Sequence, residues 1–151
     1  MRALAGAGAG FLLAVLWMDL MFDVQVRGHA DHEVPLPVRT SIAQYYARVT
    51  TAARPMNRLI ALMMLVTVGA TVAVLVQGDL AAWRAIAALV LVLGAVGLAA
   101  GRTVPNAVRL GASIDGDDAL EQSRLARSIL RDHLACVAVI SGFLLLMLLP
   151  A

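Results

Sequence analysis

Four apolar stretches dominate the sequence, and each is close to the length of a helix that crosses a lipid bilayer. They run over residues 3–22, 59–76, 83–100 and 134–149. A segment in lipid must satisfy its own backbone hydrogen bonds, and about 20 residues of helix cover the hydrocarbon core. None of the stretches shows the alternating pattern of a barrel strand. The sequence therefore predicts an all-α membrane protein, a bundle of four transmembrane helices in a single domain over residues 1–151.

The composition agrees with a membrane protein. Hydrophobic residues make up 61% of the chain and charged residues only 15%, whereas a water-soluble domain is about a quarter charged. A net charge of +2 is too small to indicate a polyanion as partner, so we expect the lipid bilayer and no nucleic acid. The single cysteine, Cys136, excludes an internal disulfide and a cysteine-based metal cage.

The arginine residues predict how the helices are oriented. All twelve basic residues are arginine, and ten of them lie in the segments 23–58 and 101–133. Only Arg2 and Arg84 lie elsewhere. Positively charged residues concentrate on the cytoplasmic side of membrane proteins. We therefore expect a multi-pass protein of the cell membrane with both long segments in the cytoplasm and both termini outside.

Both long segments contain patterns of amphipathic helices. Apolar residues recur at helical spacing over residues 38–53, which predicts a short helix at the membrane interface that ends before Pro55. Residues 117–133 show a second such pattern, with acidic residues at its start, where the helix dipole favours them. We expect this second helix to continue directly into the fourth span and Glu121 to pair with Arg124.

Small residues are spaced for helix packing on two of the predicted spans. Gly6 and Gly10 lie four residues apart on the first span, and Gly97 and Gly101 do so on the third. Small residues at this spacing let membrane helices approach closely, within a bundle or between copies. The leading functional hypothesis is therefore a structural or accessory protein that packs with itself, as a homo-oligomer, or with a larger membrane complex.

Two acidic residues mark the end of the first span. Asp19 and Asp23 are one helical turn apart and share a face. Carboxylates at a membrane boundary cost free energy unless they are paired or hydrated, and they often belong to a functional site. Other polar residues expected at the same depth are Asn57, Arg58, Arg102, Asn106, Asp132 and His133. This polar collar is either an ion-pair network or a site that opens to the cytoplasm.

If the polar collar is a site, its residue types favour acid–base chemistry. The catalytic candidates are Asp19, Asp23, Asn106 and His133. Asp19 is the deepest acid, and the imidazole of His133 titrates near neutral pH. The alternative function is therefore a membrane-embedded oxidoreductase or other enzyme that acts on a lipophilic substrate. Whether the protein is an enzyme and which cofactor it uses both stay open.

Histidines suggest a metal site as a further possibility. His29, His32 and His133 are the candidate ligands, and imidazole with carboxylate suits Zn, Fe, Mn or Ni. The competing interpretation of His29 and His32 is a solvated loop. No ionisable residue falls near the middle of a span, which disfavours a proton-coupled transporter.

The C-terminal third of the chain resembles a known family. Residues 103–109 read TVPNAVR after the third span, and an arginine-bearing helical segment over 123–131 leads into the fourth. This order is similar to that of the anthrone-oxygenase-like family of small four-span membrane proteins. The resemblance implies a four-helix bundle with a polar pocket near Asn106.

Overall fold

The computed structural model describes residues 1–29, 33–52, 54–114 and 118–150, and every element in this part of the chain is helical. The long helices are α1 (Arg2–Asp23), α3 (Arg54–Gln77), α4 (Ala82–Leu98) and α6 (Ala119–Leu148). The shorter helices are α2 (Leu36–Ala47) and α5 (Val104–Ala112). A 3-10 helix (Val24–His29) follows α1, and π-helical turns follow α2 (Arg48–Ala52) and α4 (Ala99–Thr103).

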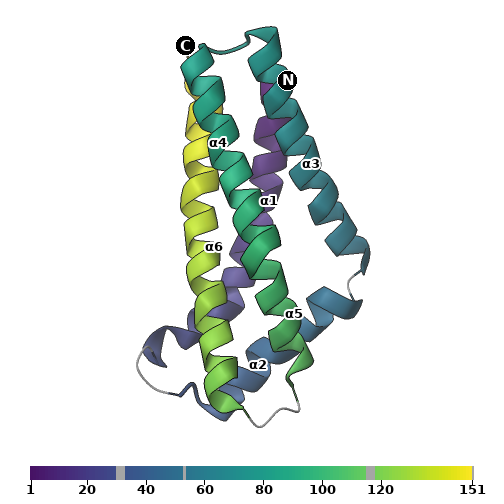
Figure 1. The fold of residues 1–151 in the computed structure, drawn as a ribbon, viewed down its shortest axis with the longest axis vertical. Helices are drawn as coiled ribbons and strands as arrows, with labels where there is room; N and C mark the ends of the chain where they lie inside the picture. Colours follow the sequence, from purple (N-terminus) through teal and green to yellow (C-terminus); the bar gives the residue numbers. More distant parts are fainter. Residues whose placement is uncertain (30–32, 53, 115–117, 151) are drawn as a thin grey trace.

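The four long helices form one bundle, as the sequence predicts. In Figure 1 they run along the long axis, with both termini and the α3–α4 turn at one end. Helices α2 and α5 lie at the other end, here called the α2 end. Helix α1 packs on α3 and α6, and α4 packs on the same two helices. Four helices in the described part are long and apolar enough to cross a membrane, so the features are those of a small integral membrane protein.

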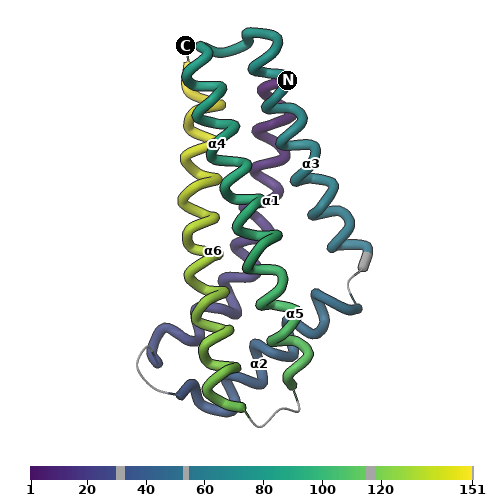
Figure 2. Tube along the Cα trace, viewed as in Figure 1, coloured from purple at the N-terminus to yellow at the C-terminus, as the bar shows by residue number. Residues whose placement is uncertain are grey.

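The third predicted span is longer in the structure than in the prediction. The π-helical turn (Ala99–Thr103) joins α4 to α5, so helix continues well past residue 100 to Ala112 (Figure 2). Pro105 does not break it, because it lies in the first turn of α5, where a missing N–H removes no hydrogen bond within that helix.

The two amphipathic segments are helical. Helix α2 and the π-helical turn after it cover most of the segment predicted over 38–53, and Pro55 lies in the first turn of α3. Helix α6 runs without a break from the α2 end to the C-terminal end, which confirms the predicted continuation. The Asp118 carboxylate accepts from the backbone N–H of Glu121, and Glu121 pairs with Arg124 at 2.6 Å. Asp115 and Asp117 lie outside the described residues.

Two arginines satisfy the C-terminal carbonyls of α6. The last four carbonyls of a helix have no partner within it. Arg84 of α4 donates to the carbonyls of Leu146 and Leu149 at 2.6 and 2.8 Å. Arg2 of α1 donates to the carbonyl of Met147 at 2.6 Å. These bonds explain why the guanidinium of Arg84 can be buried at the end of an apolar helix.

The bundle has two separate apolar cores. One fills the half near the termini and contains Ala9, Val74, Val92 and Phe143. The other lies at the α2 end, where Ile42, Leu110, Leu125 and Ile129 are among its buried members. The two cores leave a section between them in which polar side chains from α1, α2 and α6 meet.

Of the four glycines that the sequence indicates, only Gly6 lies close to a neighbouring helix, and Gly8 and Gly111 make closer contacts. A Cβ on Gly111 would lie 2.7 Å from the backbone nitrogen of Ala47, so this glycine lets α5 approach the backbone of α2. On α1, Gly8 faces Thr67 and Gly6 approaches α6. Gly10 of α1 and the α4-side glycines 94, 97 and 101 have no neighbour within 4 Å of such a Cβ.

Candidate functional site

A buried carboxylate is the centre of the polar side chains at the α2 end. Asp23, at the end of α1, is fully buried. It accepts a hydrogen bond from the Tyr46 hydroxyl of α2 at 2.7 Å, and its other oxygen lies 2.6 Å from His133 Nδ1 of α6. Three helices therefore meet at one carboxylate, and each partner satisfies part of its charge.

A second carboxylate extends the same network. Asp19 lies one turn earlier on α1 and accepts a hydrogen bond of 2.5 Å from the Tyr45 hydroxyl. His133 Nε2 is 3.8 Å from Asp19 Oδ2. The Tyr45 ring is itself fixed, because it stacks on Phe22 with 4.0 Å between the ring centroids. We call Asp19, Asp23, Tyr45, Tyr46 and His133 the acid–base network.

Both phenols are held as hydrogen-bond donors. Burial, reinforced by the hydrogen bond to Asp19, raises the pKa of Tyr45 above its ordinary value. Burial and the nearby charge of Asp23 do the same to the pKa of Tyr46. The phenols therefore stay protonated at physiological pH and point their protons at the two carboxylates.

The acid–base network borders a cavity of about 360 Å³ between the two cores. Asp19, Tyr46 and His133 line its polar end, together with Thr50, Asn57 and Thr103. The rest of its wall is aliphatic and comes from α1, α3, α4, α5 and α6; examples are Leu12, Leu16, Ile60, Met64, Val96 and Ile140. An apolar cavity with a few polar groups at one end is typical of sites for small lipophilic molecules.

The cavity has one weakly packed wall. Across residues 55–66 of α3 no side chain is buried, whereas Thr67, Ala70 and Val74 further along the same helix are. Figure 1 shows this half of α3 diverging from α1 and α4 towards the α2 end. The α3 side is therefore the most weakly packed wall of the cavity.

Positive charge is kept away from the cavity. Arg102 forms an ion pair with the buried carboxylate of Asp132, with Nε 2.9 Å from Oδ2, and Thr103 contacts the same carboxylate. Arg58 is exposed. Apart from His133, none of the described residues that line the cavity is basic. The cavity wall thus carries one carboxylate, Asp19, and one imidazole, and Asp23 is bonded to that imidazole without lining the cavity itself.

No protein-family model, curated protein or solved structure matches the chain. What the site can do therefore has to be inferred from its own residues. The resemblance of the C-terminal third to the anthrone-oxygenase-like family stays an expectation.

The structure brings together only part of the predicted polar collar. Asp19, Asp23 and His133 meet, and Asn57 lines the cavity beside them. Asn106, a catalytic candidate, instead donates to the Ser128 hydroxyl at 3.2 Å and is not among the described residues that line the cavity. The collar is thus split into an acid–base network and separate pairs such as Arg102–Asp132.

The proposed metal ligands are not gathered in the described part of the chain. No group of three or more His, Cys, Asp or Glu side chains suited to a metal occurs among the described residues. His29 lies in the 3-10 helix, where its carbonyl accepts from Arg127 at 3.0 Å. His133 is bonded to Asp23, and His32 lies outside the described residues.

Sequence reasoning missed the two tyrosines. Tyr45 and Tyr46 fall at apolar positions of the interfacial helix, and the pattern gives them a packing role only. Their hydroxyl groups were the available signal, since a buried phenol needs a hydrogen-bond partner. The partners are the two acids of α1, which lie one turn apart. Tyr45 donates to Asp19, and Tyr46 donates to Asp23.

Proposed function

We propose that the protein is a membrane-embedded enzyme that binds a lipophilic molecule in this cavity and transfers a proton at its polar group. The observation that carries the proposal is that His133 lines the polar end of a largely aliphatic cavity while its Nδ1 is bonded to the buried Asp23. This is the enzyme alternative from the sequence, with Tyr45 and Tyr46 added as positioning residues. An ion-pair network that only holds helices together would not need a cavity beside it.

The geometry supports His133 Nε2 as the base. An ionised carboxylate only accepts hydrogen bonds, so Asp23 binds the proton on Nδ1 and leaves the Nε2 lone pair free. A substrate hydroxyl at the polar end donates a hydrogen bond to Nε2, and its proton passes to Nε2 as the hydroxyl oxygen forms a bond to an electrophilic second reactant, so that no free oxyanion forms beside Asp19. Asp23 and Asp19 both stabilise the resulting imidazolium, which then gives the proton to the group that leaves the second reactant.

Charge favours a neutral polar group on the substrate. A carboxylate or phosphate at the polar end would lie beside Asp19 and near Asp23, without an arginine on the cavity wall. Like charges brought together at a desolvated site cost several kcal/mol. We therefore propose a substrate with a hydroxyl or a similar uncharged, proton-donating group on an aliphatic or cyclic body.

The arginine distribution supports an orientation for this site. Ten of the twelve arginines lie in the two segments at the α2 end, and such residues favour the cytoplasmic side. We propose a multi-pass protein of the cell membrane with the α2 end in the cytoplasm and both termini outside. The substrate then enters from the cytoplasmic half of the bilayer, beside the weakly packed half of α3.

Self-association is a second, compatible function. Its support is that Gly94, Gly97 and Gly101, which recur along α4 and its π-helical extension, have no neighbour within 4 Å of an added Cβ. Such a face is free to approach another membrane helix. A role as an accessory of a larger membrane complex would use the same face.

Two amphiphiles with the same chain length but different polar groups test the substrate class. We expect 1-dodecanol to bind the purified protein in mild detergent at least about tenfold more tightly than dodecanoate at pH 8, because the dodecanoate carboxylate would lie beside Asp19 and near Asp23. Native mass spectrometry of the complexes measures the ratio. Equal or tighter binding of dodecanoate would contradict the proposed charge selection.

A further inference from the structure

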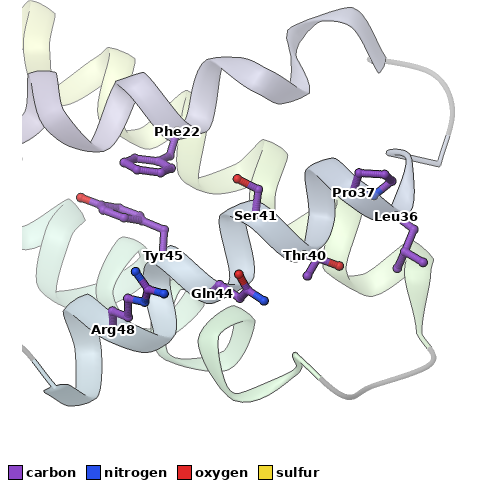
Figure 3. Close-up of a pocket in the computed structure, with 8 residues that line it drawn as sticks. All are labelled: Phe22, Leu36, Pro37, Thr40, Ser41, Gln44, Tyr45 and Arg48. Carbon is purple, nitrogen blue, oxygen red and sulfur yellow. The ribbon is translucent and has the colours of Figure 1, made fainter.

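A second hollow of about 530 Å³ lies on the outer side of α2, separate from the cavity in the bundle. Figure 3 shows it between Phe22 at the end of α1 and the first residues of α2. The stacked rings of Phe22 and Tyr45 form its inner wall, with Ser41 and Arg48 beside them. We call this hollow the α2 groove.

The α2 groove presents a row of polar groups that suits an anion. Thr40, Gln44 and Arg48 follow each other at intervals of four residues, so they lie on one face of the helix. The Ser41 hydroxyl adds a donor next to them. Hydroxyl, amide and guanidinium groups together are the donors that bind phosphate oxygens.

Arg48 is available for such a ligand. Its side chain is exposed, and in the part of the chain that the structure describes it has no hydrogen bond or ion pair. Other arginines at the α2 end are engaged, as Arg102 is by Asp132 and Arg124 is by Glu121. No acidic side chain lines the α2 groove among the described residues.

An apolar surface adjoins the polar row. Met18 is 60% exposed, and it lies one turn before Phe22 on the same face of α1. At the other side of the groove, Leu36 is 65% exposed. An acyl chain can lie along the first of these surfaces while the polar group at its end reaches the row on α2.

We infer that the α2 groove binds the phosphate-bearing headgroup of an anionic phospholipid. The phosphate lies against Arg48 and the hydroxyls of Thr40 and Ser41, and an acyl chain runs past Phe22 and Met18. The α2 groove shares only Tyr45 with the acid–base network, and its ligand is an anion that contacts neither His133 nor either carboxylate, so its test does not depend on the proposed enzyme function. A lipid explains why an apolar surface adjoins the α2 groove, because its acyl chain would cover that surface, whereas free phosphate would not.

Lipid binding to the full chain tests this site. Native mass spectrometry of the purified protein compares phosphatidylglycerol with phosphatidylcholine of the same acyl chains. We expect the wild type to prefer phosphatidylglycerol and Arg48→Gln to bind it about tenfold more weakly, since a hydrogen bond to a charged group is lost. Arg58→Gln is the matched control, because Arg58 is also exposed at the α2 end but does not line the α2 groove.

Three outcomes would overturn the site. The first is equal weakening by Arg48→Gln and Arg58→Gln, which would show that positive charge acts without a defined groove. The second is wild-type binding without preference between the two lipids. The third is displacement of phosphatidylglycerol by inorganic phosphate at equal concentration, which would identify a free anion as the ligand.

Discussion

Asp23→Ala is expected to destabilise the protein by about 3–5 kcal/mol, because it removes the charged acceptor of two buried hydrogen bonds and leaves both donors without a partner. The imidazole of His133 and the hydroxyl of Tyr46 would both lose their partner. Three helices meet at this position, so the loss affects the packing of α1, α2 and α6 together. Thermal denaturation in mild detergent, followed by the fraction of protein that stays monodisperse, measures the effect.

Asp79→Ala is the matched control for this change. Asp79 also pairs with a positive group, the N-terminal amine at 3.6 Å, but both partners are exposed. Exposed ion pairs contribute about 0–1 kcal/mol. Equal loss of stability in Asp79→Ala and Asp23→Ala would contradict a central role for the Asp23 carboxylate.

Asp23→Asn separates stability from chemistry. Asparagine has almost the same shape as aspartate, so the protein should fold. Its amide can donate to His133 Nδ1, however, and thereby moves the imidazole proton to Nε2. We expect nitrogen NMR of labelled histidine to show protonated Nδ1 in the wild type and protonated Nε2 in the variant. The same protonation state in both proteins would rule out Asp23 as the group that orients the base.

Ala99→Phe is expected to weaken the binding of lipophilic molecules without loss of stability. Ala99 lies in the π-helical turn after α4 and lines the cavity. A phenyl ring at this position occupies space that the substrate needs, and burying such a side chain stabilises by at most about 1.5–3 kcal/mol. Binding of 1-dodecanol, followed by native mass spectrometry, should fall by about tenfold or more, which corresponds to at least about 1.4 kcal/mol.

Ala100→Phe is the control for the cavity-filling variant. Ala100 is the next residue of the same turn, but it is exposed and does not line the cavity. We expect it to bind 1-dodecanol as the wild type does. If both variants bind equally well, the alcohol occupies another surface, such as the lipid-facing side of α4.

The helices were largely predictable because apolar length alone determines where a chain crosses lipid. The predicted segment over 3–22 falls within α1, the segment over 134–149 ends one residue after α6, and α6 also shows the predicted continuation from the amphipathic segment. The end of the third span was not predictable from hydropathy. Polar residues after residue 100 suggest an exit from the membrane, whereas the backbone stays helical through a π-helical turn up to Ala112.

The candidate site was predictable only in part, because contacts between helices depend on their rotation and tilt. The sequence places Asp19, Asp23 and His133 at the same depth, and in the structure the three side chains lie together. The packing of the helices determines which groups pair. Arg102 therefore binds Asp132, and two tyrosines of α2 donate hydrogen bonds to the two acids of α1. The cavity itself results from the divergence of α3, for which no residue pattern in the chain gives a signal.

Photolabelling of the cavity tests the central claim most directly. The probe is a long-chain alcohol with a diazirine at the end opposite its hydroxyl. Leu12 precedes Asp19 by seven residues, which is about 10 Å along a helix, so the diazirine should label Leu12 or the facing Met64. Labelling that is strong at these residues and absent in Ala99→Phe is the predicted result. Labelling spread evenly over exposed side chains such as Leu65 and Val90, and unchanged in the variant, would contradict a substrate-binding cavity in this bundle.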